Sequence, residues 1–236
     1  TSLPPVGPGA PRSHGSMAPT PLKIDFVSDV ACPWCAVGLA SLEKALLQLD
    51  GQVQVQLHFQ PFELNPQMGP EGQDVVEHLA GKYGSTPQQQ AANWEALRQR
   101  AAAVGFEFRK AGRGRVWNTF DAHRLLHWAG LQPGDAQLRL KKALLGTYFT
   151  EGRSVSDPSV LLQAVERAGL DRAAAQQVLD SGAYAREVRE QEAFYTGAGI
   201  QAVPSVIVND QHLIQGGQPP EVFAQALRQI AEQAPA

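Results

Sequence analysis

The chain has 236 residues, of which 43% are hydrophobic and 18% charged, and its formal net charge is −3. This length can support a well-buried core in one compact unit or in two closely packed lobes. The interspersed charges argue against binding to nucleic acid or to an anionic membrane. No apolar stretch approaches the length of a membrane span.

Residues 1–16 contain four prolines and three glycines and have no hydrophobic periodicity. Because they end directly before Met17, we interpret them as an expression-tag remnant outside the fold. The segment after Met17 lacks a basic start, and its apolar run is too short for a signal peptide. We therefore predict a cytoplasmic protein whose natural chain covers residues 17–236.

Both cysteines of the chain lie in one motif, Cys32-Pro33-Trp34-Cys35. Residues 23–27 before it alternate polar and apolar side chains, as a half-buried strand does. Residues 37–49 after it carry apolar side chains three and four positions apart, which is typical of an amphipathic helix. We therefore expect the motif to open a helix at the end of a strand. Unpaired backbone N–H groups and the helix dipole favour an anion there.

A thiolate is the anion that such a position stabilises. A helix start inside a Cys-X-X-Cys motif can lower the cysteine pKa from about 8.5 to roughly 3.5–7.5. We predict that Cys32 is a solvent-accessible nucleophile and that Cys35, one turn further on, is the buried resolving thiol. Pro33 suits the first helical turn because the N–H it lacks would have no partner there. Trp34 offers an apolar surface for binding a peptide or thiol substrate.

Two other roles of the cysteine pair fit the sequence less well. A zinc site needs three or four protein ligands, and the chain has neither a second cysteine pair nor a histidine pair close to the first. A structural disulfide across four residues would constrain little chain entropy. We therefore predict redox chemistry and no metal site.

The rest of the chain predicts a second strand at residues 53–59, followed by an almost wholly helical region. The expected helices cover residues 87–104, 119–129, 136–150, 157–168, 171–179 and 183–195. Strand character returns at residues 203–215, with Asn209-Asp210 as the turn of a hairpin. An amphipathic helix at residues 220–233 closes the chain.

This order is β-α-β, a helical block, and then β-β-α, which is the thioredoxin topology interrupted by helices. We predict an α/β, thioredoxin-like fold with a large all-helical insertion. The thioredoxin-like domain would comprise residues 17–64 and 199–236, and the helical insertion domain residues 65–198. The helical block should pack as a lid beside the active helix, and the cleft between them is the natural substrate site.

Four segments are distinctive: CPWC at residues 32–35, NTFDAHRL at 118–125, YFTEG at 148–152 and GIQAVPS at 199–205. Together they make the chain resemble DsbA-like thiol–disulfide oxidoreductases, specifically their FrnE-like branch. The resemblance implies an enzyme with a dithiol/disulfide site that acts on protein or small-molecule thiols and disulfides. It also implies a cis proline opposite the cysteines, which falls on Pro204. A cis bond would turn the Val203 backbone towards the thiols, where an extended substrate could pair with it.

Kappa-class glutathione transferases and 2-hydroxychromene-2-carboxylate isomerases are similar in architecture, so a glutathione-dependent transferase or isomerase is the alternative function. Those enzymes typically carry serine at the position of Cys32, and the presence of both cysteines here favours dithiol chemistry. We predict no tightly bound cofactor, with glutathione as a candidate redox partner. Some FrnE-like members carry a second cysteine pair that this chain lacks. The sequence leaves the oligomeric state open, with a homodimer as one option.

Polar residues elsewhere have two interpretations each. Asn118 and His123 could support the site if they face the cleft near Cys32; otherwise Asn118 caps a helix and His123 packs within it. A buried carboxylate near the cysteines could accept a proton from Cys35, but we interpret Asp29 as a strand-edge residue. The basic residues within 109–115 are interpreted as a solvated Gly-rich loop, with the steering of an anionic ligand as the alternative.

Overall fold

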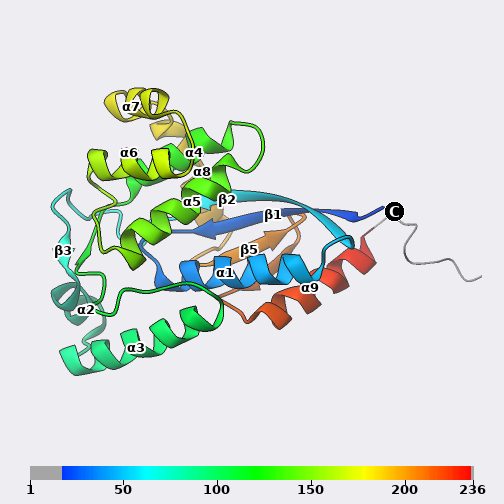
Figure 1. Cartoon of the computed structure of the whole chain (residues 1–236), viewed down its shortest axis with the longest axis horizontal. Helices are drawn as coiled ribbons and strands as arrows, with labels where there is room; N and C mark the ends of the chain where they lie inside the picture. The colour runs from blue at the N-terminus through cyan, green and yellow to red at the C-terminus, as the bar shows by residue number, and fades with distance from the viewer. Residues whose placement is uncertain (1–17, 235–236) are drawn as a thin grey trace, which may run out of the picture.

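The fold is described from a computed structural model of residues 18–234. The predicted tag at residues 1–16 lies outside the described residues. A four-stranded sheet in the order β2-β1-β5-β6 forms the centre of the molecule (Figure 1). Its strands are β1 (Thr20–Ser28), β2 (Val53–Pro61), β5 (Ser205–Val208) and β6 (His212–Gln215). Strand β1 runs parallel to β2 and antiparallel to β5, which in turn runs antiparallel to β6.

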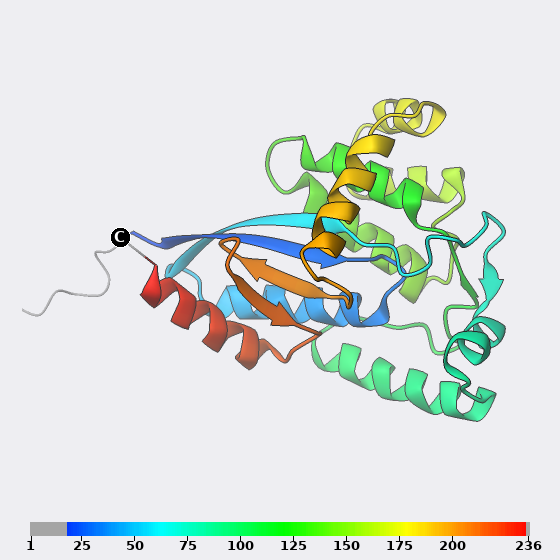
Figure 2. The same cartoon turned by 180° about the vertical axis from the view of Figure 1, so that it is seen from behind.

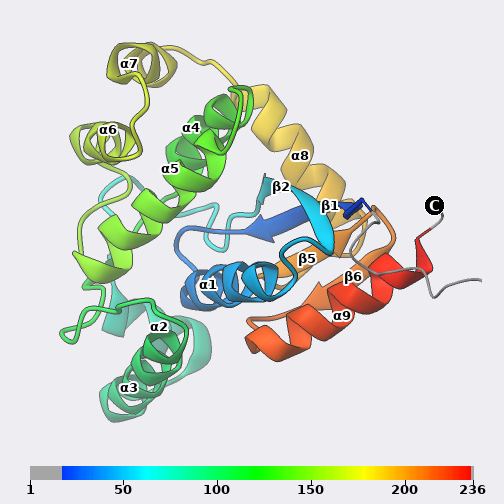
Figure 3. The same ribbon diagram turned by 45° about the vertical axis from the view of Figure 1, so that its right-hand side comes forward.

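Helices cover both faces of this sheet. Helices α1 (Pro33–Gln48) and α9 (Pro220–Gln233) lie side by side on one face, and α8 (Ala185–Gly197) covers the other (Figures 2 and 3). Successive side chains of a strand point to opposite faces. Accordingly Val27 packs on the α8 side with Tyr195, whereas Phe26 approaches α1. From Ile24 to Ser28 the central strand β1 is therefore buried on both faces.

The chain between β2 and β5 is mostly helical (Figure 1). The helices that precede α8 are α2 (Val75–Tyr83), α3 (Pro87–Ala103), α4 (Phe120–Gly130), α5 (Ala136–Leu145), α6 (Pro158–Arg167) and α7 (Arg172–Asp180). Helix α5 continues directly into a π-helical turn, η2 (Gly146–Thr150). Helix α3 packs against α1, and α4 and α5 pack against each other and against β2. The order of β-α-β, helical block and β-β-α is confirmed, while the domain boundaries stay a prediction.

Two features of this block were not anticipated from the sequence. Helix α2 is only nine residues long and has no buried residue, so its few apolar side chains give a weak signal for a helix. It is marked instead by Asp74, whose side chain accepts a hydrogen bond from the backbone N–H of Glu77. Directly before it, β3 (Gln73–Asp74) pairs antiparallel with β4 (Arg115–Val116). A ladder of two residues depends on a partner far away in the chain and leaves no local pattern.

The hairpin and the last helix agree with the sequence. Asn209 and Asp210 form the turn between β5 and β6 with φ angles of 53° and 58°. Both angles are in the left-handed region that a tight two-residue hairpin turn requires, and asparagine and aspartate tolerate it better than most residues. Helix α9 covers Pro220–Gln233 as predicted. Within residues 18–234, every helix is too short or too polar to cross a membrane.

Candidate active site

The cysteine motif occupies the junction of β1 and α1. Cys32 is the N-cap residue of α1, with an extended backbone at φ −93° and ψ 115°, and Pro33 follows in the first turn. The backbone N–H of Cys35 donates to the carbonyl oxygen of Cys32 at 3.1 Å, which closes that turn. No acidic residue stands in the first turn of α1. No carboxylate therefore competes for the backbone N–H groups of Trp34 and Cys35, which act on the Cys32 thiol.

The two thiols have opposite acidities. The pKa of Cys32 is lowered, first by a hydrogen bond from the Cys35 thiol and further by the backbone N–H groups of Cys35 and Trp34, against the effects of burial and of Asp29. Burial raises the pKa of Cys35 well above its ordinary value, and the adjacent Cys32 raises it further. Of the two thiols, Cys32 therefore ionises more readily, and Cys35 holds its proton more firmly.

Cys32 is less exposed than the sequence led us to expect. The residue retains 5% of its accessible surface, and Cys35 retains none. The reason is the segment before β5, which lies against the helix start. The Cys32 Sγ is 3.7 Å from the carbonyl oxygen of Val203. The residue borders the cavity described below.

The Val203–Pro204 peptide bond is cis. Pro204 is buried, and its ring packs against Gly38 in the second turn of α1. A Cβ atom at Gly38 would stand 3.0 Å from Pro204 Cγ, so a larger residue there would press on the proline ring. The close approach holds the Val203 carbonyl next to Cys32.

A cavity of about 740 Å³ opens at Cys32. Its wall includes Pro33, Trp34 and Val203, three of the residues predicted to bind substrate. Trp34 is 39% exposed, so its ring is available to a ligand. Pro204, the fourth, lies behind Val203 and supports the wall from inside. Residues of α2 and α3 form the opposite side, so the helical block does pack beside the active helix as predicted.

Asn118 and His123 do not line this cavity. The Asn118 side chain accepts a hydrogen bond from the backbone N–H of Phe120 and donates one to the carbonyl oxygen of Met68, both at 2.9 Å. It therefore serves the start of α4, as in the simpler of the two interpretations. His123 is buried and lies 3.1 Å from Asp29, measured from Nε2 to Oδ1. The structure thus places His123 behind the cysteine motif rather than in front of it.

Asp29 is not a strand-edge residue, which corrects our interpretation. It is 1% exposed, and its carboxylate accepts hydrogen bonds from His123 and from the backbone N–H of Leu64 at 2.9 Å. Burial alone would raise the pKa of Asp29, but the contacts with His123 and Leu64 outweigh it and lower the pKa. Because the backbone carbonyl of Asp29 accepts from the N–H of Cys32 at 3.2 Å, the carboxylate anchors the loop that carries the nucleophile.

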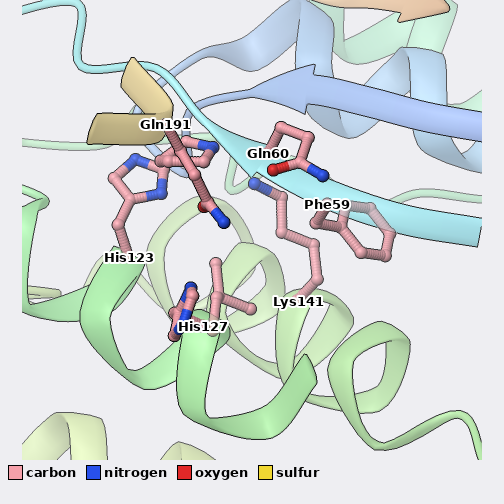
Figure 4. Close-up of a pocket in the computed structure, with 8 residues that line it drawn as sticks. Phe59, Gln60, His123, His127, Lys141 and Gln191 are labelled. Carbon is pink, nitrogen blue, oxygen red and sulfur yellow. The ribbon is translucent and has the colours of Figure 1, made fainter. Parts of the chain in front are cut away.

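Lys141 on α5 is a further buried charge that the sequence analysis missed. It is 1% exposed, and burial lowers its pKa while the nearby Cys35 and Asp29 act to raise it. Its ammonium lies 5.7 Å from the ring centre of Phe59. Figure 4 shows Lys141, His123 and Gln191 directed towards a common small cavity of about 10 Å³, which is close to the space of one water molecule. The sequence could have predicted this burial, because position 141 belongs to the apolar stripe of α5 together with Leu138 and Leu145.

Arg113 is also closer to the site than its loop suggested. Its Nη1 donates to the carbonyl oxygen of Ala31 at 3.0 Å, directly before Cys32, and the side chain lines the cavity. The other basic residues of that loop turn elsewhere; Arg115, for example, donates to the carbonyl oxygen of Glu71. No group of residues suited to hold a metal ion occurs in the described part of the chain.

Comparisons with known proteins agree with this geometry. A family model of the DSBA-like thioredoxin domain matches residues 23–228. The crystal structure of the probable DsbA oxidoreductase SCO1869 from Streptomyces coelicolor is 36% identical, with a TM-score of 0.83 over 91% of this chain and 92% of that one. The uncharacterized protein YwbO of Bacillus subtilis is 27% identical over 87% of this chain and 96% of its own length.

A more distant structure shares the fold. The cytosolic disulfide reductase DsbM from Pseudomonas aeruginosa, solved with GSH, is 19% identical, with a TM-score of 0.61 over 89% of this chain and 99% of that one. The thioredoxin-like α/β fold with its helical insertion is thereby confirmed, as is the expected family. From the cysteine motif at the start of α1, the sheet order and the matched model, the chain belongs to the DSBA-like thioredoxin domain family of thiol–disulfide oxidoreductases.

Proposed function

We propose that this protein is a thiol–disulfide oxidoreductase that uses Cys32-Pro33-Trp34-Cys35 as its dithiol/disulfide centre. The opposite acidities of the two thiols carry the proposal. Cys32 has a lowered pKa and borders a cavity, whereas Cys35 has a raised pKa and no exposed surface. A substrate can therefore meet a reactive thiolate first, and the second thiol is kept within reach but protected.

The reaction follows from this arrangement. The Cys32 thiolate attacks one sulfur of a substrate disulfide, so a mixed disulfide forms and the other substrate sulfur leaves as a thiolate. Cys35 then loses its proton and attacks the Cys32 sulfur, which releases the second substrate thiol. The substrate disulfide is reduced and the protein dithiol is oxidised to the Cys32–Cys35 disulfide. Run in reverse, the oxidised protein forms a disulfide in a dithiol substrate.

Val203 supplies a place for an extended substrate. Its carbonyl oxygen lies beside Cys32 at 3.7 Å, and its side chain borders the cavity. A peptide that pairs with this backbone by strand addition would carry its sulfur towards the nucleophile. In this proposal Pro33 and Trp34 provide the apolar part of the cavity wall. Asp29 and His123 hold the loop that carries Cys32 in place.

The test is the reduction of insulin by dithiothreitol, compared among the wild type, Cys32→Ser and Cys35→Ser. We expect the wild type to accelerate precipitation of the insulin B chain and Cys32→Ser to be inactive. Cys35→Ser should accumulate mixed disulfides on Cys32, visible by mass spectrometry, because the resolving thiol is gone. Thermal unfolding of each variant controls for loss of the fold. Wild-type activity in both variants would exclude the dithiol mechanism.

The alternative is a glutathione-dependent transferase or isomerase, in which Cys32 only holds or activates glutathione. The same variants separate the two functions, since such an enzyme would retain activity in Cys35→Ser. The raised pKa and complete burial of Cys35 beside Cys32 favour the dithiol function. Glutathione enters our proposal as a candidate redox partner rather than as a resident cofactor. The fold shared with the glutathione-bound DsbM structure supports a thiol ligand of that kind.

Three finer assignments belong to the same proposal. The motifs at residues 118–125 and 199–205 support membership of the FrnE-like branch. We propose a cytoplasmic setting, in which the cysteine pair is mostly reduced between turnovers. A homodimer is an open option that sedimentation at micromolar concentration would decide.

A further inference from the structure

The cavity at Cys32 is lined by charges of only one sign. Three cationic side chains border it: Lys82 from α2, Arg100 from α3 and Arg113 from the loop before β4. Among the described residues, no aspartate or glutamate contributes to its wall. This is unusual for a chain whose formal net charge is −3, because its carboxylates outnumber its cationic side chains.

The three cations are bound by neutral groups. The Lys82 ammonium donates to the Asn65 side-chain oxygen at 3.3 Å. The Arg100 guanidinium donates to a backbone carbonyl oxygen at 3.4 Å, and that of Arg113 donates to the carbonyl of Ala31 at 3.0 Å. None of the three forms an ion pair in the part of the chain that the structure describes. Their charges are therefore left for a ligand.

Two of these charges contact the chain next to the nucleophile. Arg113 contacts the residue directly before Cys32, and the Arg100 guanidinium lies 5.3 Å from the ring centre of Trp34, two residues after it. The field reaches further into the cavity, where His78 has a lowered pKa because of burial and the positive charges of Lys82 and Arg113. Because Arg100 and Arg113 line the same cavity as Cys32, a ligand whose sulfur meets Cys32 would lie near both positive groups.

We propose that this cavity selects low-molecular-weight disulfides and thiols that carry negative charge, with Arg100 and Arg113 as the specificity-determining residues and Lys82 as a third charge in the same wall. This inference rests on the proposed function, because the ligand is the substrate of that dithiol centre. The cavity volume of about 740 Å³ is within the range of small-molecule pockets, roughly 300–1,000 Å³. One-signed clefts raise the local concentration of ligands of the opposite charge and their association rates by roughly 10- to 1,000-fold.

The chemistry balances with one small disulfide per turnover. The reduced protein gives two electrons: its Cys32 thiolate breaks the ligand S–S bond, and one anionic thiolate leaves and is protonated by solvent. Cys35 gives up its proton and displaces the second ligand thiolate from Cys32. The products are two anionic thiols and the Cys32–Cys35 disulfide.

The test uses three disulfides of similar size and different charge: dithiodipropionate with two carboxylates, bis(2-hydroxyethyl) disulfide with none, and cystamine with two ammonium groups. The reduced protein is mixed with each, and oxidation of the cysteine pair is followed by acid quench and mass spectrometry. Each rate is divided by that of dithiothreitol with the same disulfide, because the leaving thiols differ in pKa. At an ionic strength of about 10 mM we expect the dianion to exceed the dication by about tenfold or more, and at about 0.5 M the three ratios should converge.

Glutamine variants of the three cationic residues test whether they cause the charge preference. The double variant Lys82→Gln/Arg100→Gln keeps the Arg113 contact with Ala31 and should lose most of the preference, measured as the ratio of the dianion rate to the neutral-disulfide rate. Adding Arg113→Gln should abolish the remainder. The matched control is Arg98→Gln, which removes one charge from the same helix α3 at a position that pairs with Glu95 outside the cavity. It should retain the wild-type preference.

The outcomes separate this inference from the proposed function. Charge selection would be overturned if the three disulfides gave equal normalised rates. It would also be overturned if the preference survived the loss of all three cations, or fell as much in Arg98→Gln as in the cavity variants. Each of these results would leave the dithiol centre intact. If no disulfide oxidises the reduced protein faster than it oxidises dithiothreitol, and insulin reduction is also absent, the proposed function itself fails.

Discussion

Charged side chains lie on both sides of the cysteine motif, but in the described part of the chain they are unpaired on the cavity side and paired on the inner side. On the cavity side, Arg100 and Arg113 contact only neutral groups and remain available to a ligand. On the inner side, Asp29 and His123 are buried and bonded to each other, and Lys141 lies close enough to feel both Asp29 and Cys35. Charges that are buried and paired hold structure, because removing one partner is costly. Charges that are open and unpaired cost little to leave free and are suited to binding.

The largest effect should come from breaking the inner pair. Asp29→Ala leaves His123 and the N–H of Leu64 without an acceptor in a buried place, which should reduce the free energy of unfolding by about 3–5 kcal/mol. The measurement is urea unfolding at pH 7, with Asp50→Ala, at an exposed position after α1, as the control for loss of an aspartate. A cost below about 1 kcal/mol would mean that the pair is not structural.

The pH dependence of that variant has a defined sign. Because the pKa of Asp29 in the folded protein is lower than its ordinary value of 3.8, its stabilisation is present above that value and is lost as the pH falls through the folded pKa. The difference between wild type and Asp29→Ala should therefore be constant near neutrality and shrink only in acid.

The cavity side can be disturbed through its support. In Gly38→Ala the new methyl group would stand 3.0 Å from Pro204 Cγ and 3.4 Å from the backbone of Gly217. Overpacking of this kind typically costs about 1–3 kcal/mol, and it should also move the Val203 carbonyl away from Cys32 and slow insulin reduction. Gly81→Ala is the matched control, since a Cβ there meets no atom within 4 Å, and it should stabilise α2 by about 0.5–1 kcal/mol. Equal behaviour of the two variants would contradict the packing argument.

A smaller effect is expected from Lys141, a buried charge on the inner side that acts on Cys35 of the active site. Lys141 lowers the pKa of Cys35, so Lys141→Met should raise that pKa further and slow the resolving step. Stability should change by less than about 1.5 kcal/mol, because a similar apolar side chain replaces a buried charge. Pulse alkylation of Cys35 against pH measures the pKa, and Lys142→Met, whose lysine lies 54% exposed beside Glu43, is the control. An unchanged alkylation profile would remove Lys141 from the active site.

Features set by neighbouring residues could be predicted from the sequence, whereas features set by residues distant in the chain could not. The helix start at Cys32, the hairpin turn at Asn209 and the final helix follow from local rules on caps, turns and periodicity, and all are found. Asp29 was misjudged because burial after the end of a strand depends on Leu64 and His123, which are distant in the chain. Arg113 was missed for the same reason, since nothing in a Gly-rich loop shows which of its four basic residues will reach Ala31.

The smallest effect should come from Glu63 and Glu192, whose like charges meet at α8. Glu63 and Glu192 interact, and burial together with Glu63 raises the pKa of Glu192 to about 8, while Arg189 contacts both. Since the folded pKa is raised, the protonated form stabilises the fold at low pH, and this contribution is lost as the pH rises through about 8. Glu192→Gln mimics the protonated acid, so its Tm should match the wild type near pH 5 and exceed it slightly at pH 9. The control is Glu190→Gln, on the exposed side of α8, whose Tm should follow that of the wild type at both pH values. If the Tm of Glu192→Gln also ran parallel to the wild type across this pH range, the two carboxyl groups would share no proton.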